Sequence, residues 1–216
     1  MTVREDGMWA QVTGSGYDTS KTRPALFLDR DGVINEDVGY LHEPAELQLI
    51  PQAAETIAQA NALGIAVIVV TNQGGIGLDY FGWPEFVAVQ QSMAAQLTEA
   101  AQARIDGIFA SPYHPRGTGI YAHPDHPSRK PNPGMLLTAA EMLNLDLSGS
   151  WIVGDHWRDL EAGKNAGLAG GMHVLTGHGL HDDQREQAIA LGDNDFQVIS
   201  AQSIAAAEAQ IPLFRA

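Results

Sequence analysis

The chain has 216 residues, of which 44% are hydrophobic and 18% charged, and it contains no cysteine. This composition is typical of one soluble globular domain and argues against disorder, while the lack of cysteine excludes disulfides and thiolate metal sites. A formal net charge of -14 would repel nucleic acid and anionic membranes, so we expect neither as a partner. An anionic ligand would need a local cationic site.

Residues 1–23 are polar, and we expect them to form an arm on the surface, followed by a single domain over residues 24–216. The N-terminal residues lack the apolar core of a signal peptide. The longest apolar run, at 65–70, is too short to span a bilayer. A cytoplasmic location is therefore expected.

The chain then alternates between strand and helix patterns. Apolar, β-branched runs at 25–29 and 65–70 are typical of strands buried on both faces of a parallel sheet, and helix formers at 51–64 lie between them. This pattern predicts an α/β fold with a doubly wound parallel sheet, in which ligands bind at the carboxyl ends of the strands. The remaining expected elements are helices over 84–103 and 134–145, a helix from about Trp157, a closing helix, and strands at 107–110, 151–155, 172–176 and 196–200.

Residues 111–133 interrupt the alternation with a segment that is rich in Pro, Gly and His and longer than most loops. His114, His123 and His126 raise the hypothesis of a zinc site, because imidazole is a common zinc ligand. Their spacing matches no standard closed site, and no cysteine can complete one. We therefore favour histidines that form hydrogen bonds within the loop.

Polar residues occur where four predicted elements end. The segments are "FLDRDG" at 27–32, "VVTNQGG" at 69–75, "SRKPNPG" at 128–134 and "IVGDHWRD" at 152–159. Since the carboxyl ends of parallel strands share one edge of a sheet, we expect these side chains to converge there: Asp29, Asp31, Thr71, Lys130, Asp155 and Asp159.

This set of residues fits phosphoryl transfer through an aspartyl-phosphate. One carboxylate attacks phosphorus, a second protonates the leaving oxygen and later activates water, and a divalent ion offsets their charge. Asp29 and Asp31 are two residues apart, so on an extended segment they face the same ligand, and Gly32 permits a tight turn after them. Asp155 is placed to complete an oxygen ligand set for Mg²⁺.

The other polar residues suit phosphate binding. Thr71 offers a hydroxyl beside backbone N–H groups, and Lys130 offers a fixed positive charge. Asp159 has two interpretations, a supporting role in the site or an ordinary acid in the first turn of a helix, which the helix dipole favours.

The four segments resemble the motifs of the haloacid dehalogenase (HAD) superfamily of phosphatases. From about Pro24 to Thr176 the sequence is more narrowly similar to the heptose 1,7-bisphosphate 7-phosphatases and to the related histidinol-phosphate phosphatases. The resemblance implies a HAD-type fold without a large cap domain, so the long loop would have to close the site.

The resemblance also assigns roles to individual residues. It implies that Asp29 is the nucleophile and Asp31 the acid/base, and that Mg²⁺ is bound by Asp29, Asp155 and the backbone carbonyl of Asp31. It further implies that the phosphoryl group and the substrate are held by Thr71, Asn72, Lys130 and Arg129.

One departure from these relatives concerns zinc. Many of them hold zinc in the long loop through three cysteines and a histidine, and the positions aligned with those ligands are here Ser111, Tyr113, His126 and Ser128. The resemblance therefore implies a member without zinc.

The implied activity is Mg²⁺-dependent removal of the 7-phosphate of a small phosphorylated sugar, D-glycero-D-manno-heptose 1,7-bisphosphate, during synthesis of a heptose precursor of lipopolysaccharide. Histidinol phosphate or another small phosphomonoester stays open as the substrate. A phosphate-receiving signalling module is an alternative of another class, because it also combines an acidic cluster with a Thr and a Lys. Asp31 favours the enzyme, since rapid turnover of an aspartyl-phosphate needs a second acid.

Overall fold

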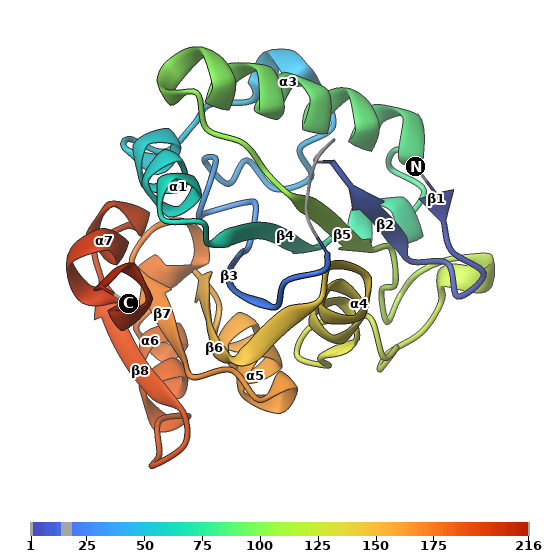
Figure 1. Ribbon diagram of the computed structural model, residues 1–216. Helices are drawn as coiled ribbons and strands as arrows, with labels where there is room; N and C mark the ends of the chain where they lie inside the picture. The colour runs from blue at the N-terminus through green and yellow to red at the C-terminus, as the bar shows by residue number, and fades with distance from the viewer. Residues whose placement is uncertain (1, 14–18, 216) are drawn as a thin grey trace.

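The computed structural model describes residues 2–13 and 19–215, and within them eight strands form one sheet in the order β1-β2-β5-β4-β3-β6-β7-β8 (Figure 1). The six strands from β5 to β8 in this order run parallel to one another, whereas β2 is antiparallel to β5 and β1 is antiparallel to β2. The prediction of an α/β fold with a parallel sheet is confirmed. The strands are β1 (Thr2–Val3), β2 (Trp9–Val12), β3 (Arg23–Leu28), β4 (Ala66–Asn72), β5 (Gly107–Ser111), β6 (Leu145–Gly154), β7 (Gly170–Val174) and β8 (Gln197–Ala201).

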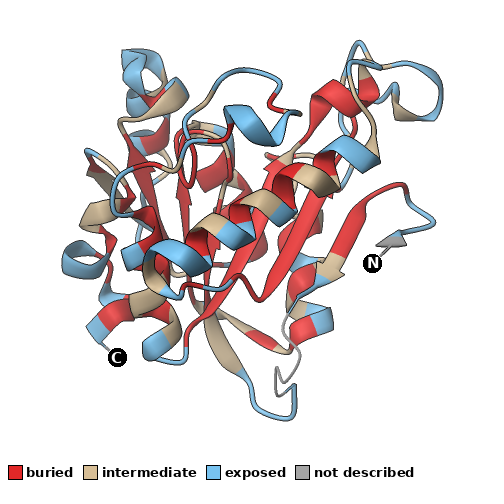
Figure 2. Cartoon of the chain, turned by 90° about the horizontal axis from the view of Figure 1, so that it is seen from above, coloured by how far each residue is buried: buried red, intermediate tan, exposed pale blue. Residues whose placement is uncertain are grey.

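Helices cover both faces of the sheet, and Figure 2 shows the buried strands between them. The alternation of side chains along β3 supplies both cores: Leu26 and Leu28 pack on one face, and Ala25 and Phe27 on the other, all fully buried. The first face is covered by α1 (Ala53–Ala62), α3 (Trp83–Ala101) and α7 (Ala207–Gln210), and the second by α4 (Gly134–Leu143), α5 (Trp157–Ala166) and α6 (Asp182–Ala190).

Short helical turns complete the chain. The helix α2 (Gly74–Gly77) directly follows β4 and precedes α3. The 3-10 turns are η1 (Pro44–Glu46), η2 (Gly119–Tyr121), η3 (Gly177–Leu180), η4 (Ile204–Ala206) and η5 (Pro212–Arg215).

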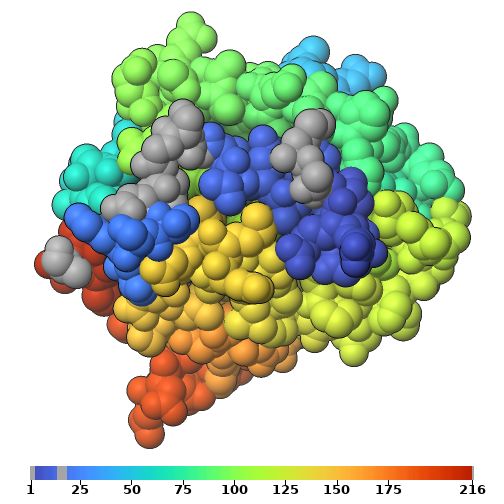
Figure 3. Space-filling model, turned by 45° about the vertical axis from the view of Figure 1, so that its right-hand side comes forward, coloured from blue at the N-terminus to red at the C-terminus, as the bar shows by residue number. Residues whose placement is uncertain are grey.

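The N-terminal segment differs from the expected polar arm. Residues 9–12 form β2, which pairs with β5, and Met8, Trp9 and Ala10 are buried. Figure 3 shows these N-terminal residues in dark blue, beside the yellow-green segment near residues 110–130, and the Tyr113 hydroxyl donates a hydrogen bond to the Asp6 carbonyl at 2.6 Å. The segment joins the sheet because β5 would otherwise leave backbone groups unpaired at its edge. Residues 1 and 14–18 of the expected arm lie outside the described residues.

Two helix predictions near the C-terminus need correction. The sequence pattern predicts no helix between the strands at 172–176 and 196–200, but α6 lies there, and its one buried residue is Ala188. The expected closing helix is only the four residues of α7, preceded by η4.

The order of the strands positions the functional site. The chain runs from β3 to β4 and β5 on one side, then crosses to β6 on the other side of β3. The carboxyl ends of β3, β4 and β6 therefore lie next to one another at the point where the direction of winding reverses, where doubly wound folds bind ligands.

Within the described residues, no helix combines the length and the apolar character that crossing a membrane requires.

Candidate active site

A cavity of about 440 Å³ opens at the carboxyl ends of the central strands. Every site residue that the sequence predicted lines it: Asp29, Asp31, Thr71, Asn72, Arg129, Lys130, Asp155 and Asp159. Asp29 directly follows β3, Thr71 and Asn72 end β4, and Asp155 follows β6. The sheet topology thus brings together residues that are far apart in the sequence. His114, His123 and His126 do not line this cavity.

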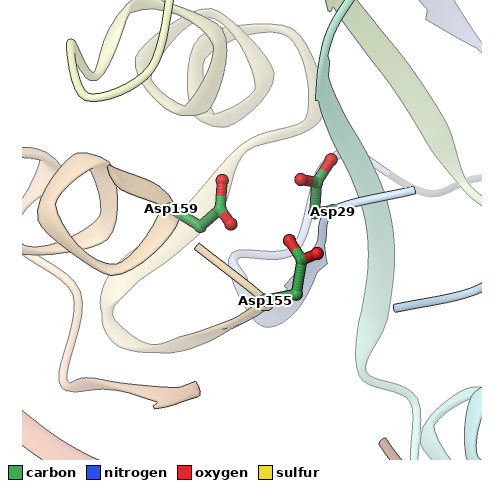
Figure 4. A group of neighbouring side chains, drawn as sticks. All are labelled: Asp29, Asp155 and Asp159. Atoms are coloured by element: carbon green, nitrogen blue, oxygen red, sulfur yellow. The ribbon is translucent and has the colours of Figure 1, made fainter. Parts of the chain in front are cut away.

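Three of the carboxylates that line the cavity lie close together, as Figure 4 shows. Asp29, Asp155 and Asp159 each offer one oxygen, and these three oxygens lie within 4.8 Å of one another. Asp155 and Asp159 are each only 2% exposed. Such a buried group of negative charges is stable only with cations nearby.

Lys130 supplies part of that compensation. Its buried ammonium Nζ lies 3.0 Å from Asp29 Oδ1 and 2.8 Å from Asp159 Oδ1, and it donates a hydrogen bond to the Val70 carbonyl at 2.8 Å. Burial works against this charge, but Asp159 and Asp29 outweigh burial and raise the pKa of Lys130. Asp159 is therefore a partner of Lys130, which favours its supporting role in the site.

Asp155 has no ion-pair partner among the described residues, and its carboxylate Oδ2 accepts a hydrogen bond from the backbone N–H of His178 at 2.7 Å. Burial, followed by the charges of Asp159 and Asp29, raises the pKa of Asp155 to about 9. Burial likewise raises the pKa of Asp29 to about 7, although Lys130 opposes the rise.

The donor set therefore fits Mg²⁺. Three carboxylates face one ammonium, so negative charge is in excess, and carboxylate oxygens are the ligands that Mg²⁺ prefers. Burial, together with repulsion between the carboxylates, raises the pKa values of Asp29 and Asp155, and a divalent cation beside them would offset both effects.

Asp31 is held apart from this cluster by three neighbours. Arg30, which is 1% exposed, donates from Nε to Oδ1 at 3.1 Å and from Nη2 to Oδ2 at 2.8 Å. Asn35 Nδ2 donates to Oδ1 at 3.0 Å, and Gln73 Nε2 lies 3.3 Å from Oδ2. The same Gln73 amide donates to Thr71 Oγ1 at 2.8 Å, so it links Asp31 to β4.

Gly32 makes the turn after these aspartates possible. Its φ of +77° lies in the left-handed region, and a Cβ at this position would collide with the carboxylate of Asp155. The prediction of a tight turn at Gly32 is confirmed.

Asn72 ties the end of β4 to the long loop. Its side chain donates to the Lys130 carbonyl at 3.1 Å and accepts from the Lys130 backbone N–H at 3.0 Å. This reciprocal pair positions the backbone of Lys130, so that its ammonium reaches Asp29.

Ser111, Tyr113, His126 and Ser128, the four residues that the resemblance places at zinc-ligand positions, contact one another. The Ser128 hydroxyl donates to Ser111 Oγ at 3.1 Å and lies 2.9 Å from His126 Nδ1. The rings of Tyr113 and His126 stack, with centroids 3.5 Å apart. These contacts support the interpretation that His126 forms hydrogen bonds within the loop.

Sequence reasoning missed several residues of the site. Arg30 and Gln73 hold Asp31, and Arg158, His156 and His178 line the cavity. The position of Gln73, directly after Thr71 and Asn72 at the strand end, could have indicated it, whereas a buried Arg30 has no signal in a single sequence.

Comparisons with known proteins agree with this geometry. A family model described as HAD-hydrolase-like matches residues 127–199. The D-glycero-beta-D-manno-heptose-1,7-bisphosphate 7-phosphatase of Mesorhizobium japonicum is 51% identical over 172 residues, which are 80% of this chain and 78% of that protein. The enzyme of the same name from Escherichia coli K12 is 37% identical over 73% of this chain and 82% of its own length.

Two solved structures also resemble this chain. A putative HAD-like phosphatase from Mesorhizobium loti is 44% identical, with a TM-score of 0.76, over 88% of this chain and 97% of that one. The D,D-heptose 1,7-bisphosphate phosphatase of B. bronchiseptica, complexed with magnesium and phosphate, is 30% identical, with a TM-score of 0.72, over 89% of this chain and 99% of that one. With a relative 51% identical over most of both chains, this protein belongs to the family of D-glycero-beta-D-manno-heptose-1,7-bisphosphate 7-phosphatases, within the HAD superfamily.

Proposed function

We propose that this chain removes the 7-phosphate of D-glycero-D-manno-heptose 1,7-bisphosphate in a Mg²⁺-dependent reaction that passes through an aspartyl-phosphate. The observation that carries the proposal is the cluster of Asp29, Asp155 and Asp159, of which Asp29 and Asp159 pair with Lys130, with Asp31 two residues after Asp29. We favour the β anomer, because the similar enzymes of M. japonicum and E. coli carry it in their names.

In the proposed reaction, Asp29 is the nucleophile. Its carboxylate attacks phosphorus, the bond from phosphorus to the sugar oxygen breaks, and that oxygen takes a proton from Asp31. Asp31 then accepts a proton from water as the water attacks the aspartyl-phosphate, which releases inorganic phosphate and restores Asp29. Asp31 lies beside the cluster, yet its carboxylate faces Arg30, Asn35 and Gln73, which suits a group that exchanges a proton without binding the metal.

The phosphoryl group would be held by Thr71 and Lys130, with the Lys130 backbone fixed by Asn72. Lys130 places positive charge where negative charge moves during the transfer. Bound Mg²⁺, held by Asp29, Asp155 and the Asp31 carbonyl, would supply further positive charge to the phosphoryl oxygens. Asp159 keeps Lys130 in place through their 2.8 Å ion pair.

Phosphate release from both anomers of the heptose bisphosphate tests this function, with histidinol phosphate alongside and each assay repeated in EDTA. We expect fast release from one heptose anomer in Mg²⁺ and none in EDTA. Preference for histidinol phosphate would refute the substrate and keep the chemistry. A stable aspartyl-phosphate without turnover would instead favour the phosphate-receiving module.

A further inference from the structure

The turn between β1 and β2, residues 4–8, lies against the long loop at 111–133 (Figure 3). Two backbone hydrogen bonds close this turn, from the Gly7 N–H to the Arg4 carbonyl at 2.9 Å and from the Arg4 N–H to the Met8 carbonyl at 2.8 Å. The strand β2 that follows is paired with β5 along its whole length. The sheet therefore holds the turn at a fixed place beside the loop.

Tyr113, near the start of the long loop, makes the contact with this turn. Its side chain is buried, and its hydroxyl donates a hydrogen bond to the Asp6 carbonyl at 2.6 Å. Gly7 lies so close to the same hydroxyl that a Cβ on Gly7 would be 2.5 Å from its oxygen, and φ at Gly7 is +77°. Glycine suits this position for both reasons, since it has no Cβ and adopts a positive φ without strain.

The other contacts of Tyr113 are with the far end of the same loop. Its ring stacks on that of His126 with centroids 3.5 Å apart, and its backbone carbonyl accepts a hydrogen bond from Arg129 Nη1 at 2.5 Å. The His126 carbonyl in turn accepts from the Arg129 backbone N–H at 2.8 Å. Both the backbone and the guanidinium of Arg129 are thus positioned by Tyr113 and by the residue stacked on it.

Arg129 and Lys130 are neighbours in the chain but are held by different contacts. Asn72 fixes the backbone of Lys130, and two carboxylates of the buried cluster hold its ammonium. Within residues 2–13 and 19–215, by contrast, the guanidinium of Arg129 forms no ion pair and bonds to the Tyr113 carbonyl. A shift of Tyr113 would therefore move Arg129 and leave Lys130 in place.

We propose that the turn at residues 4–8 is a positioning element of the active site, which acts through Tyr113 to set where Arg129 lies in the cavity and hence how tightly substrate binds. The inference rests on the proposed function, with Arg129 as the substrate contact that the sequence resemblance implies. Tyr113 is a positioning residue, since Arg129 lines the cavity and Tyr113 does not. Because Lys130 is held independently, a change at the turn raises KM and leaves kcat nearly unaltered.

Gly7→Ala tests this coupling, because the added Cβ would push the Tyr113 hydroxyl away. We expect KM for the heptose 1,7-bisphosphate to rise about threefold to thirtyfold, since a contact to a charged group is weakened rather than removed. The kcat should stay within about twofold of wild type. An unchanged KM, or a loss confined to kcat, would overturn the inference.

Gly64→Ala is the matched control. Its φ of +76° is almost that of Gly7, and nothing lies within 4 Å of an added Cβ. The control therefore introduces the same backbone strain without the collision, and we expect the KM of wild type. An equal rise of KM in Gly64→Ala would show that general destabilisation, not Tyr113, causes the effect.

Tyr113→Phe provides a rescue that a loss of stability alone would not give. On its own it removes the bond to the Asp6 carbonyl and should raise KM, by less than Gly7→Ala does. In the Gly7→Ala background it also removes the colliding oxygen, which leaves the nearest Tyr113 ring carbon 3.3 Å from the new Cβ. The double variant should therefore have a lower KM than Gly7→Ala, whereas independent effects would add. A further rise of KM in the double variant would contradict the proposed coupling.

Hydrogen exchange followed by NMR, without substrate, keeps the inference separate from the proposed reaction. The Arg129 amide, which bonds to the His126 carbonyl, should exchange faster in Gly7→Ala and in Tyr113→Phe than in wild type or Gly64→Ala. The Lys130 amide, which bonds to Asn72, should not change.

The two kinds of failure are distinguishable. If wild type does not hydrolyse the heptose bisphosphate, the proposed function fails, and exchange of the Arg129 amide decides whether the turn positions this residue. If Gly7→Ala does not fold, Tyr113→Phe carries the same comparison, because it introduces no collision. Wild-type exchange of the Arg129 amide in Tyr113→Phe would refute the inference in either case.

Discussion

Gln73→Leu tests whether the orientation of Asp31 controls the rate of the proposed reaction. Gln73 is 4% exposed, and its amide contacts both Thr71 Oγ1 and Asp31 Oδ2. Leucine has a similar volume but no donor, so it removes both contacts without opening a large cavity. Asp31 keeps its bonds to Arg30 and Asn35, and it therefore stays paired but less constrained.

The expected loss follows from the lost contact. A hydrogen bond to a charged group contributes about 1.5–3 kcal/mol, and the separation of 3.3 Å between Gln73 and Asp31 is longer than usual for N–H···O, which favours the lower end. Since about 1.4 kcal/mol corresponds to tenfold in rate, we expect kcat to fall roughly tenfold with little change in KM. Removing the acid itself with Asp31→Asn should cost about a hundredfold or more.

Steady-state phosphate release measures both constants, and Gln90→Leu is the control. Gln90 is 5% exposed in α3, and within the described part of the chain its side-chain amide has no hydrogen-bond partner. Leucine there should leave kcat unchanged and the stability equal or higher, because a buried unpaired amide is removed. A folded Gln73→Leu variant with kcat within about twofold of wild type would refute the role given to the contact between Gln73 and Asp31.

Three further predictions concern the acidic cluster and the turn beside it. Asp29→Asn should abolish turnover while circular dichroism stays that of wild type, and substantial residual activity would show that Asp29 is not the nucleophile. In EDTA, urea unfolding should show lower stability at pH 8 than at pH 5. The folded-state pKa values of Asp29 and Asp155, about 7 and about 9, lie above the ordinary aspartate value of 3.8, so the folded protein holds protons that the unfolded chain releases. The free energy of unfolding therefore falls as pH rises from about 4 through this range. Asp29→Asn should make the fall of stability with pH shallower, and an unchanged profile would contradict the raised pKa of Asp29. Gly32→Ala should lower the free energy of unfolding by about 1–3 kcal/mol, since φ at this position is positive and the added Cβ would collide with Asp155. Gly39→Ala is the control: φ is also positive there but the space around it is open, so this variant measures the backbone strain without the collision.

The tertiary structure decided several elements that carry little signal in the sequence. β2 is four residues, Trp9–Val12, and it is a strand because β5 offers an edge with which it can pair. α6 has no apolar stripe, since Ala188 is its one buried residue, so hydrophobic periodicity could not predict it. The orientations of side chains could not be predicted from the sequence either. Asp31 faces Arg30, and Arg158 lines the cavity, because of rotamers and packing that residue spacing does not encode.

The sequence by itself determined the parallel sheet and the main composition of the site. Strands buried on both faces must be apolar throughout, so the continuous apolar runs of β3 and β4 could be distinguished from the helical segment between them. Polar residues at the ends of such strands meet at one edge of the sheet, which is why the sequence pattern alone predicts that Asp29, Thr71 and Asp155 lie together. The partners of each carboxylate were decided only in three dimensions, because Lys130 reaches both Asp29 and Asp159 through contacts between segments far apart in the chain.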